Sequence, residues 1–367
     1  MVRTIELVES EVSPRTRWHF VVLRDDDLVA LGECSDSGNP AALSQELSVL
    51  VPALRECDLV AEREQLLDAI ERRIGEATSA RAFVIATLMG GLEQMLTDYA
   101  AQTAAVPVWK WLGGSPPDPI PVYANINRMP GGRAPDDVAL MAARAADAGF
   151  TAIKCAPFDV PDPDQNLPAL GLARLRAIRA AVGDDIQLKV DCHERIAVDD
   201  LHGLLPDLEE LGIAWLEDAV SLQNVAQLRQ LRAATTLPIA GGETMFAPHE
   251  AQPAVSEGLV DILMPDVKHA GGIAGVLAVA RAVPELVVSP HNPSGPVATA
   301  ASAHLFAVCP NATVLEYQFG EAPWRSELVG GLERIEEGRL HVDNRPGLGV
   351  ALPPRHPSFR VLWSTTI

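Results

Sequence analysis

Short runs of alternating apolar and polar residues recur along the chain from about residue 120 onward. Most of the segments between these runs repeat apolar residues at helical spacing, as in 136–150 and 272–283. The eight candidate strands are 120–127, 151–157, 186–192, 213–219, 237–243, 261–266, 285–291 and 313–318. Strands that alternate with helices predict an α/β fold with a parallel sheet, and eight such units predict a closed (β/α)8-type barrel. The pattern leaves the helix after the last strand undefined.

The first part of the chain has a different pattern. Alternating runs at 3–10 and 17–34 predict antiparallel strands joined at a turn, and helical spacing follows, most clearly over 80–102. Gly113, Gly114, Pro116, Pro117 and Pro119 then interrupt any helix. We therefore expect an α+β capping domain over 1–115, the barrel over 116–330, and a C-terminal segment, 331–367, that returns to the capping domain.

Composition narrows the function classes. The formal net charge is −20, from 29 basic and 49 acidic residues, which argues against a nucleic-acid partner. Charge or proline interrupts every apolar run well before the roughly 18 residues of a membrane span, so no membrane partner is expected. Five scattered cysteines without a CxxC pair fit a reducing compartment, and the N-terminus does not resemble a signal peptide. We expect a cytoplasmic protein.

Ionisable residues stand at the C-terminal ends of seven of the predicted strands. They are Lys154, Asp191 with His193, Glu217 with Asp218, Glu243, Asp266, His291 and Glu316. In a parallel barrel these strand ends meet at one mouth, where such folds carry their active sites. The sequence therefore predicts one shared site.

Three of these carboxylates, Asp191, Glu217 and Glu243, are each 26 residues apart, one βα unit per step. Adjacent strands lie about 4.8 Å apart, so the three side chains can reach one point. A divalent cation would remove their mutual repulsion, and all-oxygen ligation favours Mg²⁺. The alternative is that each acid only caps the helix that follows it.

Asp266 and His291 end the next two strands. A carboxylate beside an imidazole orients it and raises its pKa, which suits a general base. Since residues i and i+2 of an extended chain share a face, His193 is expected on the same side as Asp191, beside a metal-bound substrate. The alternative for His193 is a histidine without chemistry at a helix start.

Several motifs resemble the enolase superfamily in its mandelate racemase branch over nearly the whole chain. They are PVWKWLGG (107–114), AGGETMF (240–246), PDVKHAGGI (265–273), SPHNPSGP (289–296) and RPGLGV (345–350). VDCHERI and SPHNPSGP are most similar to the galactonate dehydratase group of acid-sugar dehydratases. The resemblance implies a cap over a (β/α)8 barrel, Mg²⁺-dependent removal of the proton α to a carboxylate, and an enediolate intermediate. It also implies a homo-oligomer, commonly a dimer or an octamer.

The resemblance assigns a role to each strand-end residue. It implies Asp191, Glu217 and Glu243 as metal ligands, His291 oriented by Asp266 as the base, and His193 as the acid that protonates a leaving β-hydroxyl. Lys154 and Glu316 match groups that bind the substrate carboxylate. Trp18 and Cys34, on cap loops 11–18 and 33–39, and Arg325 are open between substrate contact and a structural role.

One departure from the branch bears on the reaction. The second lysine of the branch's Lys-x-Lys pair, which is a base in the racemases, is Ala156 in this chain. Lys268 stands two residues beyond the position where relatives carry a strand-six lysine. The expected reaction is therefore dehydration of an aldonate or aldarate to a 2-keto-3-deoxy acid. A racemase or epimerase of a carboxylate substrate, and a non-catalytic barrel, stay open as alternatives.

Overall fold

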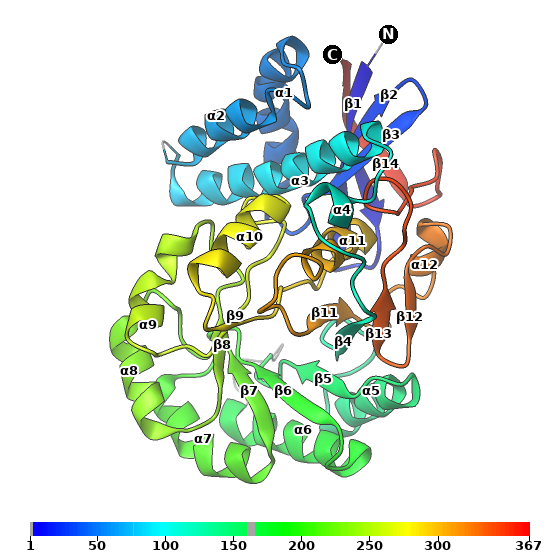
Figure 1. The fold of residues 1–367 in the computed structure, drawn as a ribbon. Coiled ribbons are helices and arrows are strands. Elements are labelled where there is room, and N and C mark those ends of the chain that lie inside the picture. Colours follow the sequence, from blue (N-terminus) through cyan, green and yellow to red (C-terminus); the bar gives the residue numbers. More distant parts are fainter. Residues whose placement is uncertain (1–2, 76, 160–165) are drawn as a thin grey trace.

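A computed structural model describes residues 3–75, 77–159 and 166–367 of the chain. Eight parallel strands form its central sheet (Figure 1). They are β4 (Ile120–Asn125), β5 (Ala152–Cys155), β6 (Gln187–Asp191), β7 (Ile213–Glu217), β8 (Ile239–Gly241), β9 (Ile262–Leu263), β10 (Val287–Val288) and β11 (Leu315–Gln318). Each strand pairs with its neighbour in sequence from β4 to β10. All eight strands lie within the ranges that the alternation predicted.

The sheet closes on itself. Strand β11 pairs in parallel with β4, with Leu315 opposite Val122, and an isolated bridge joins Val288 to Ala312 just before β11. The expected (β/α)8-type barrel is therefore confirmed. Strands β9 and β10 are only two residues long, because Pro265 and Pro290 follow soon after and a proline has no N–H for the strand ladder.

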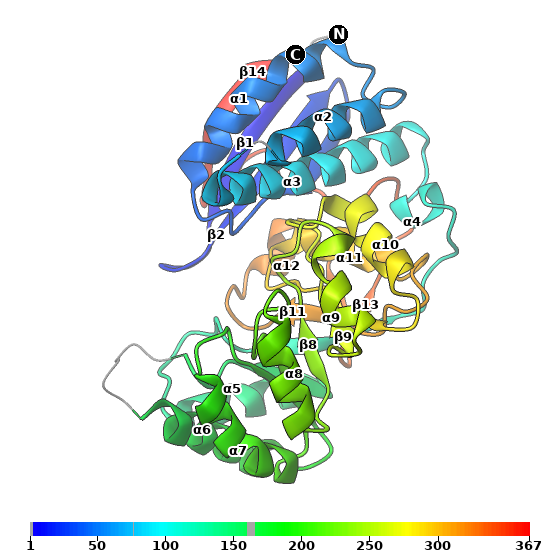
Figure 2. The same cartoon turned by 90° about the vertical axis from the view of Figure 1, so that its left-hand side faces the viewer.

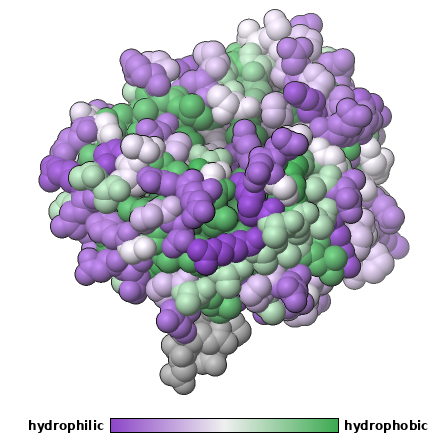
Figure 3. Space-filling view, turned by 90° about the horizontal axis from the view of Figure 1, so that it is seen from below, coloured by the Kyte–Doolittle hydropathy of each residue, from purple (hydrophilic) through white to green (hydrophobic). Residues whose placement is uncertain are grey.

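Helices surround the barrel and bury their apolar faces against it. They are α5 (Pro135–Asp147), α6 (Leu167–Val182), α7 (Val198–Glu210), α8 (Val225–Ala234), the short η1 (Pro248–Glu250), α9 (Gln252–Ser256), α10 (Gly272–Ala282), α11 (Pro296–Leu305) and the four-residue α12 (Arg325–Leu328). The outward faces are mostly polar, and hydrophilic residues cover much of the surface seen from below (Figure 3). Inside the barrel, Tyr123 and Trp215 pack edge to face directly beneath the predicted site, where Trp215 Nε1 donates to Glu217 Oε2 at 3.1 Å.

An antiparallel sheet lies beside the barrel, in the strand order β14–β1–β2–β3 (Figure 2). It contains β1 (Arg3–Glu11), β2 (Arg17–Asp25), β3 (Leu28–Glu33) and, from the far end of the chain, β14 (Phe359–Thr366). The helices α1 (Pro40–Glu56), α2 (Arg63–Gly75), α3 (Ser79–Thr103) and the short α4 (Val108–Trp111) follow in the sequence. The segment 331–367 contacts both the barrel and the antiparallel sheet. The hairpin β12 (Arg334–Glu336) and β13 (Arg339–His341) joins β4, and only β14 joins the first sheet. The boundaries near residues 115 and 330 stay predictions.

Helix α3 connects the two parts through very close backbone contacts. A Cβ at Gly90 would lie 2.2 Å from the carbonyl oxygen of Lys268, and a Cβ at Gly32 would lie 1.8 Å from the oxygen of Gly91. No side chain fits at these positions, so α3 can approach both β3 and the loop after β9. That loop carries Asp266, so the packing of α3 fixes the back of the predicted site.

Among the helices of the described residues, none is both long and apolar enough to cross a membrane.

The close approach at Gly90 generates a stability prediction. Gly90→Ala should lower the thermal unfolding midpoint, because overpacking of this kind costs about 1–3 kcal/mol. Gly203→Ala is the matched control, since Gly203 lies in α7 with no atom within 4 Å of its added Cβ. The control should be neutral or stabilising by up to ~1 kcal/mol. Equal midpoints for Gly90→Ala and the wild type would contradict the packing described.

Candidate active site

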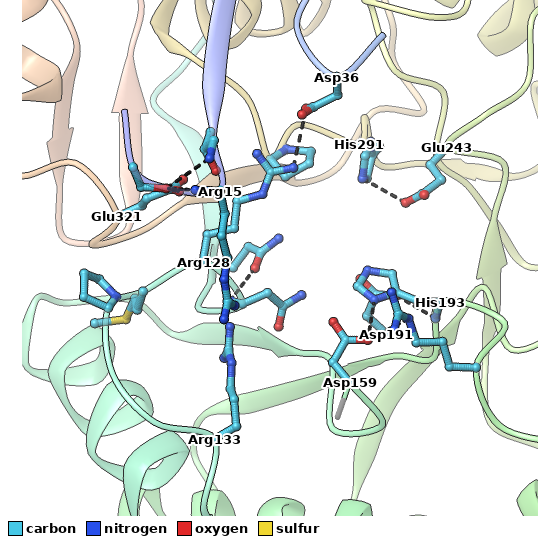
Figure 4. A pocket seen from close by; sticks show the side chains of 18 of the residues that line it. Arg15, Asp36, Arg128, Arg133, Asp159, Asp191, His193, Glu243, His291 and Glu321 are labelled. Atoms are coloured by element: carbon cyan, nitrogen blue, oxygen red, sulfur yellow. Dashed lines mark hydrogen bonds and ion pairs between the residues drawn. The ribbon is translucent and has the colours of Figure 1, made fainter. Parts of the chain in front are cut away.

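A cavity of about 780 Å³ opens at the C-terminal ends of the barrel strands (Figure 4). Barrel residues Asp191, His193, Glu243 and His291 line it, together with residues 13–16 and Asp36 from loops of the antiparallel sheet. Its volume lies in the range of small-molecule sites. The loops predicted to cover the site, 11–18 and 33–39, therefore both reach it.

Lys154 lies at the centre of the strand-end carboxylates and is fully buried. Its Nζ lies 2.5 Å from Glu217 Oε1, 2.7 Å from Glu316 Oε1 and 3.4 Å from Asp191 Oδ2. Burial lowers the pKa of Lys154, but these negative charges outweigh it and hold the pKa well above its usual value. Lys154 is therefore a fixed cation at the base of the site.

One ammonium does not balance the acids around it. Burial raises the pKa of Glu217 to about 8 despite the opposing effect of Lys154, and the charges of Asp191 and Glu316 add to this rise. Asp191 and Glu217 are direct register partners on β6 and β7. A site with this surplus of carboxylate oxygen fits a divalent cation, which would keep the acids ionised.

The group with the closest ligand geometry is Glu217, Glu243 and His291, whose ligand atoms lie within 4.8 Å of one another. Among the described residues, Asp191 does not join this group and instead contacts His193 and Lys154. The structure thus brings together two of the three predicted metal ligands and places the third beside them. The three-carboxylate assignment stays a prediction.

His291 is held by carboxylates on both ring nitrogens. Its Nδ1 lies 2.8 Å from Asp266 Oδ2 and its Nε2 lies 2.9 Å from Glu243 Oε2. Burial lowers the pKa of His291, but Glu243, Glu316 and Asp266 raise it well above the ordinary value. Lys268 Nζ, 2.7 Å from Asp266 Oδ2, helps to keep the pKa of Asp266 low although burial opposes this. The Asp266–His291 pair expected from the sequence is therefore present.

His193 reaches Asp191 by a different route from the one the sequence suggested. The backbone is not extended at His193 but left-handed, with φ 47°, and Glu194 follows with φ 51°. The His193 N–H donates to Asp191 Oδ1 at 3.2 Å, which turns the chain back. The prediction that His193 shares a face with Asp191 as residue i+2 of an extended strand was wrong, because β6 ends at Asp191.

The His193 ring nevertheless faces the cavity. Its Nε2 lies 3.0 Å from Asp191 Oδ2 and its Nδ1 lies 3.1 Å from Asp159 Oδ1. Burial lowers the pKa of His193, but the hydrogen bonds and charges of the two aspartates raise it to about 10. The ring is therefore a protonated acid at neutral pH in the absence of a bound cation.

Glu316 is fixed by several donors. Asn125 Nδ2 donates to Glu316 Oε1 at 2.6 Å, and the backbone N–H of Asn292 donates to Oε2 at 2.8 Å. The sequence reasoning missed Asn125, Asn292 and Asp159. Asn125 ends the first barrel strand at the level of the other site residues, so the reading of strand ends could have included it.

Three further candidates are structural. Trp18 and Cys34 are buried outside the lining of the cavity, and Trp18 packs edge to face on Trp324. Arg325 is buried in an ion pair with Glu333, with Nε 2.7 Å from Oε2. These side chains support the site and do not line it.

Comparisons with known proteins show which family this chain is similar to. A family model described as Enolase C-terminal domain-like matches residues 137–356. A D-galactonate dehydratase of Verminephrobacter eiseniae (strain EF01-2) is 30% identical over 363 residues, which cover 96% of this chain and 92% of that protein. A D-xylonate dehydratase of Haloferax volcanii is 27% identical over 351 residues, which cover 91% and 83%. The crystal structure of a mandelate racemase/muconate lactonizing enzyme-like protein of Rubrobacter xylanophilus DSM 9941 superposes with a TM-score of 0.85, at 26% identity and 98% coverage of both chains.

The environment of His193 predicts a pH-dependent contribution to stability. A pKa raised from 6.5 to about 10 means that the protonated ring stabilises the fold fully below pH 6.5 and progressively less as the pH rises toward 10. In metal-free buffer, His193→Gln should therefore lower the thermal midpoint at pH 6 and have a much smaller effect at pH 10. A difference that does not change with pH would contradict the assignment. In ¹⁵N-histidine spectra, Asp159→Asn should lower the His193 titration midpoint.

Proposed function

The chain belongs to the enolase superfamily, and on that premise we propose that it is a Mg²⁺-dependent dehydratase of a sugar acid, an aldonate or aldarate. The reaction removes the proton α to the carboxylate, passes through an enediolate and expels the β-hydroxyl. Tautomerisation of the resulting enol gives a 2-keto-3-deoxy acid. The relatives named as galactonate and xylonate dehydratases support this reaction class.

The observation that carries the proposal is a pair of imidazoles facing one cavity beside a cluster of strand-end carboxylates (Figure 4). His291 is paired with Asp266, and His193 is paired with Asp159 and Asp191. Elimination of water needs one group to accept the α-proton and another to protonate the leaving oxygen. Two separately supported histidines meet this need.

Asp191, Glu217 and Glu243 would hold the Mg²⁺. When bound there, the ion supplies Lewis-acid stabilisation of the enediolate charge.

The chain's own residues complete the proton transfers. Asp266 holds Nδ1 of His291, and Nε2, which contacts Glu243 Oε2 at 2.9 Å in this structure, would accept the α-proton when Glu243 serves as a metal ligand instead. His193 then donates a proton from its ring to the departing β-hydroxyl, so the C–O bond breaks and water leaves. Lys154 and Glu316 lie at the base of the cluster, 2.7 Å apart at Nζ and Oε1, where they would position the substrate carboxylate.

Ala156 favours elimination over racemisation. A racemase needs a base on each face of the α-carbon, and the chain has alanine where the branch's racemases carry that second lysine. An epimerase that uses His193 or Lys154 on the opposing face, and a barrel without activity, are the rival functions that the following experiments separate.

Two histidine variants test the assignment of the base and the acid. His291→Asn should lose both keto-acid formation and exchange of the α-proton with D₂O, each by about 10²–10⁴-fold. His193→Asn should lose keto-acid formation by a similar factor while α-exchange persists, since proton abstraction precedes departure of the hydroxyl. A semicarbazide assay and ¹H NMR across a library of aldonic and aldaric acids measure the two steps. Inversion at the α-carbon without keto acid would favour the epimerase, and no reaction with any acid would favour the non-catalytic barrel.

Metal binding has a readout that does not depend on activity. Millimolar Mg²⁺ should raise the thermal midpoint of the wild type, because a ligand that binds only the folded state stabilises it. Glu217→Gln and Glu243→Gln should remove most of that shift, whereas Glu71→Gln, at an exposed position on α2, should keep it. A full shift in Glu217→Gln would contradict the assigned ligands.

The proposal extends to the assembly and the compartment. We infer a homo-oligomer, a dimer or an octamer, in the cytoplasm, on the grounds of the family resemblance and the scattered cysteines.

A further inference from the structure

Arginines line the cavity of this acidic protein together with its carboxylates. The chain has a net charge of −20, yet Arg15, Arg128, Arg133 and Arg195 all line the cavity. Arg15 lies on the turn between β1 and β2, and Arg128 and Arg133 lie on the loop between β4 and α5. Guanidinium groups gathered at one cavity point to an anionic ligand.

The four arginines differ in their partners. Arg195 Nε lies 3.1 Å from Asp159 Oδ1 and so belongs with His193. Arg128 is half-buried and makes only a long contact, 3.4 Å from its Nη2 to Asp36 Oδ2. Within residues 3–75, 77–159 and 166–367, neither Arg15 nor Arg133 has a carboxylate partner within 4.0 Å. Among the described residues, two guanidinium groups thus lack a close carboxylate, and the guanidinium of Arg128 has one long contact.

These three arginines lie on the wall of the cavity opposite the catalytic group. Figure 4 shows Arg15, Arg128 and Arg133 on one side and His291, Glu243, His193 and Asp191 on the other. A substrate whose reacting carboxylate lies among the strand-end acids therefore directs its far end toward the arginines.

The positive charge of Arg15, Arg128 and Arg133 favours an anionic group of the ligand beside them. Asp36 and Glu321 line the same part of the cavity, and Glu321 Oε1 accepts a hydrogen bond from Ser13 Oγ at 2.9 Å. Asp36 also lies 3.8 Å from Lys268 Nζ, so its charge is shared with that ammonium and the three arginines keep an excess of positive charge over the acids beside them. Planar guanidinium groups also suit the geometry of a carboxylate.

We propose that Arg128 and Arg133, with Arg15, form a subsite for a second carboxylate, so that the substrate is an aldarate and not an aldonate. The inference rests on the proposed function, because that function places the reacting carboxylate at the opposite wall. It narrows the substrate from sugar acids in general to sugar diacids.

Binding to an inactive variant tests the subsite separately from the reaction. His291→Asn with Mg²⁺ is titrated by calorimetry with an aldarate, the aldonate of the same hydroxyl configuration, and that aldonate phosphorylated at its terminal oxygen. The aldarate should bind at least about tenfold more tightly than the aldonate, as expected for added charged hydrogen bonds. Arg128→Met and Arg133→Met together should remove most of this preference and change aldonate binding by less than about threefold.

The control is Arg176→Met, which removes one positive charge from the exposed surface of α6 and so matches each single arginine substitution. It should keep the preference for the diacid. If the double variant does not fold, Arg133→Met alone decides the question, because its side chain makes no ion pair in the part of the chain described here.

Three results would overturn the subsite: equal affinities for aldarate and aldonate, a preference for the phosphorylated aldonate, or equal losses for all three ligands in the arginine variants. The proposed function fails by a different result, namely no keto acid and no α-exchange from the wild type with any sugar acid. A diacid preference without turnover would keep the subsite and reject the reaction.

Discussion

The organisation of this site depends on one buried cation among several buried carboxylates. Lys154 contacts Asp191, Glu217 and Glu316 from three other strands of the barrel, with no exposed surface of its own. Buried charges of one sign are unfavourable unless they are neutralised, so the carboxylates that the closed barrel buries need the Lys154 ammonium beside them. The ammonium balances part of the negative charge, and burial, followed by the charges of Asp191 and Glu316, raises the pKa of Glu217 to about 8. That residual charge is what suits the site to a divalent cation.

The antiparallel sheet and α3 contribute more than a cover for this site. Glu33, at the end of β3, accepts hydrogen bonds from the backbone N–H groups of Gly295 and Ala298, where α11 begins. Glu93 of α3 accepts from the N–H of Ile273, at the start of α10. Carboxylates at helix N-termini are stabilising, and these two helices follow the loops that carry His291 and Asp266. The same elements that carry the substrate-facing loops therefore also position the base and its partner.

Much of this arrangement could be predicted from the sequence, because it follows from the spacing of apolar residues and from the positions of ionisable residues at the strand ends. Eight alternating runs separated by helices fixed the barrel, and the ionisable residues at their ends marked the mouth; the family resemblance seen in the motifs is confirmed by the comparisons. Local backbone geometry was not predictable in the same way. His193 and Glu194 adopt left-handed conformations that alternation does not encode, and the hydrogen bond from the His193 N–H to Asp191 sets them.

Side-chain partners between segments distant in the sequence could not be predicted either. The buried Arg325–Glu333 pair and the contact between Arg128 and Asp36 depend on tertiary packing that pattern alone does not supply.

The pairing of β1 with β14 has a consequence for biosynthesis. Strand β1 leaves the ribosome before the barrel strands, and its neighbour β14 leaves only after the whole barrel has been translated. Until then one edge of β1 presents unpaired backbone groups, which invite association with other chains. The nascent chain therefore carries an open sheet edge until β14 has been translated.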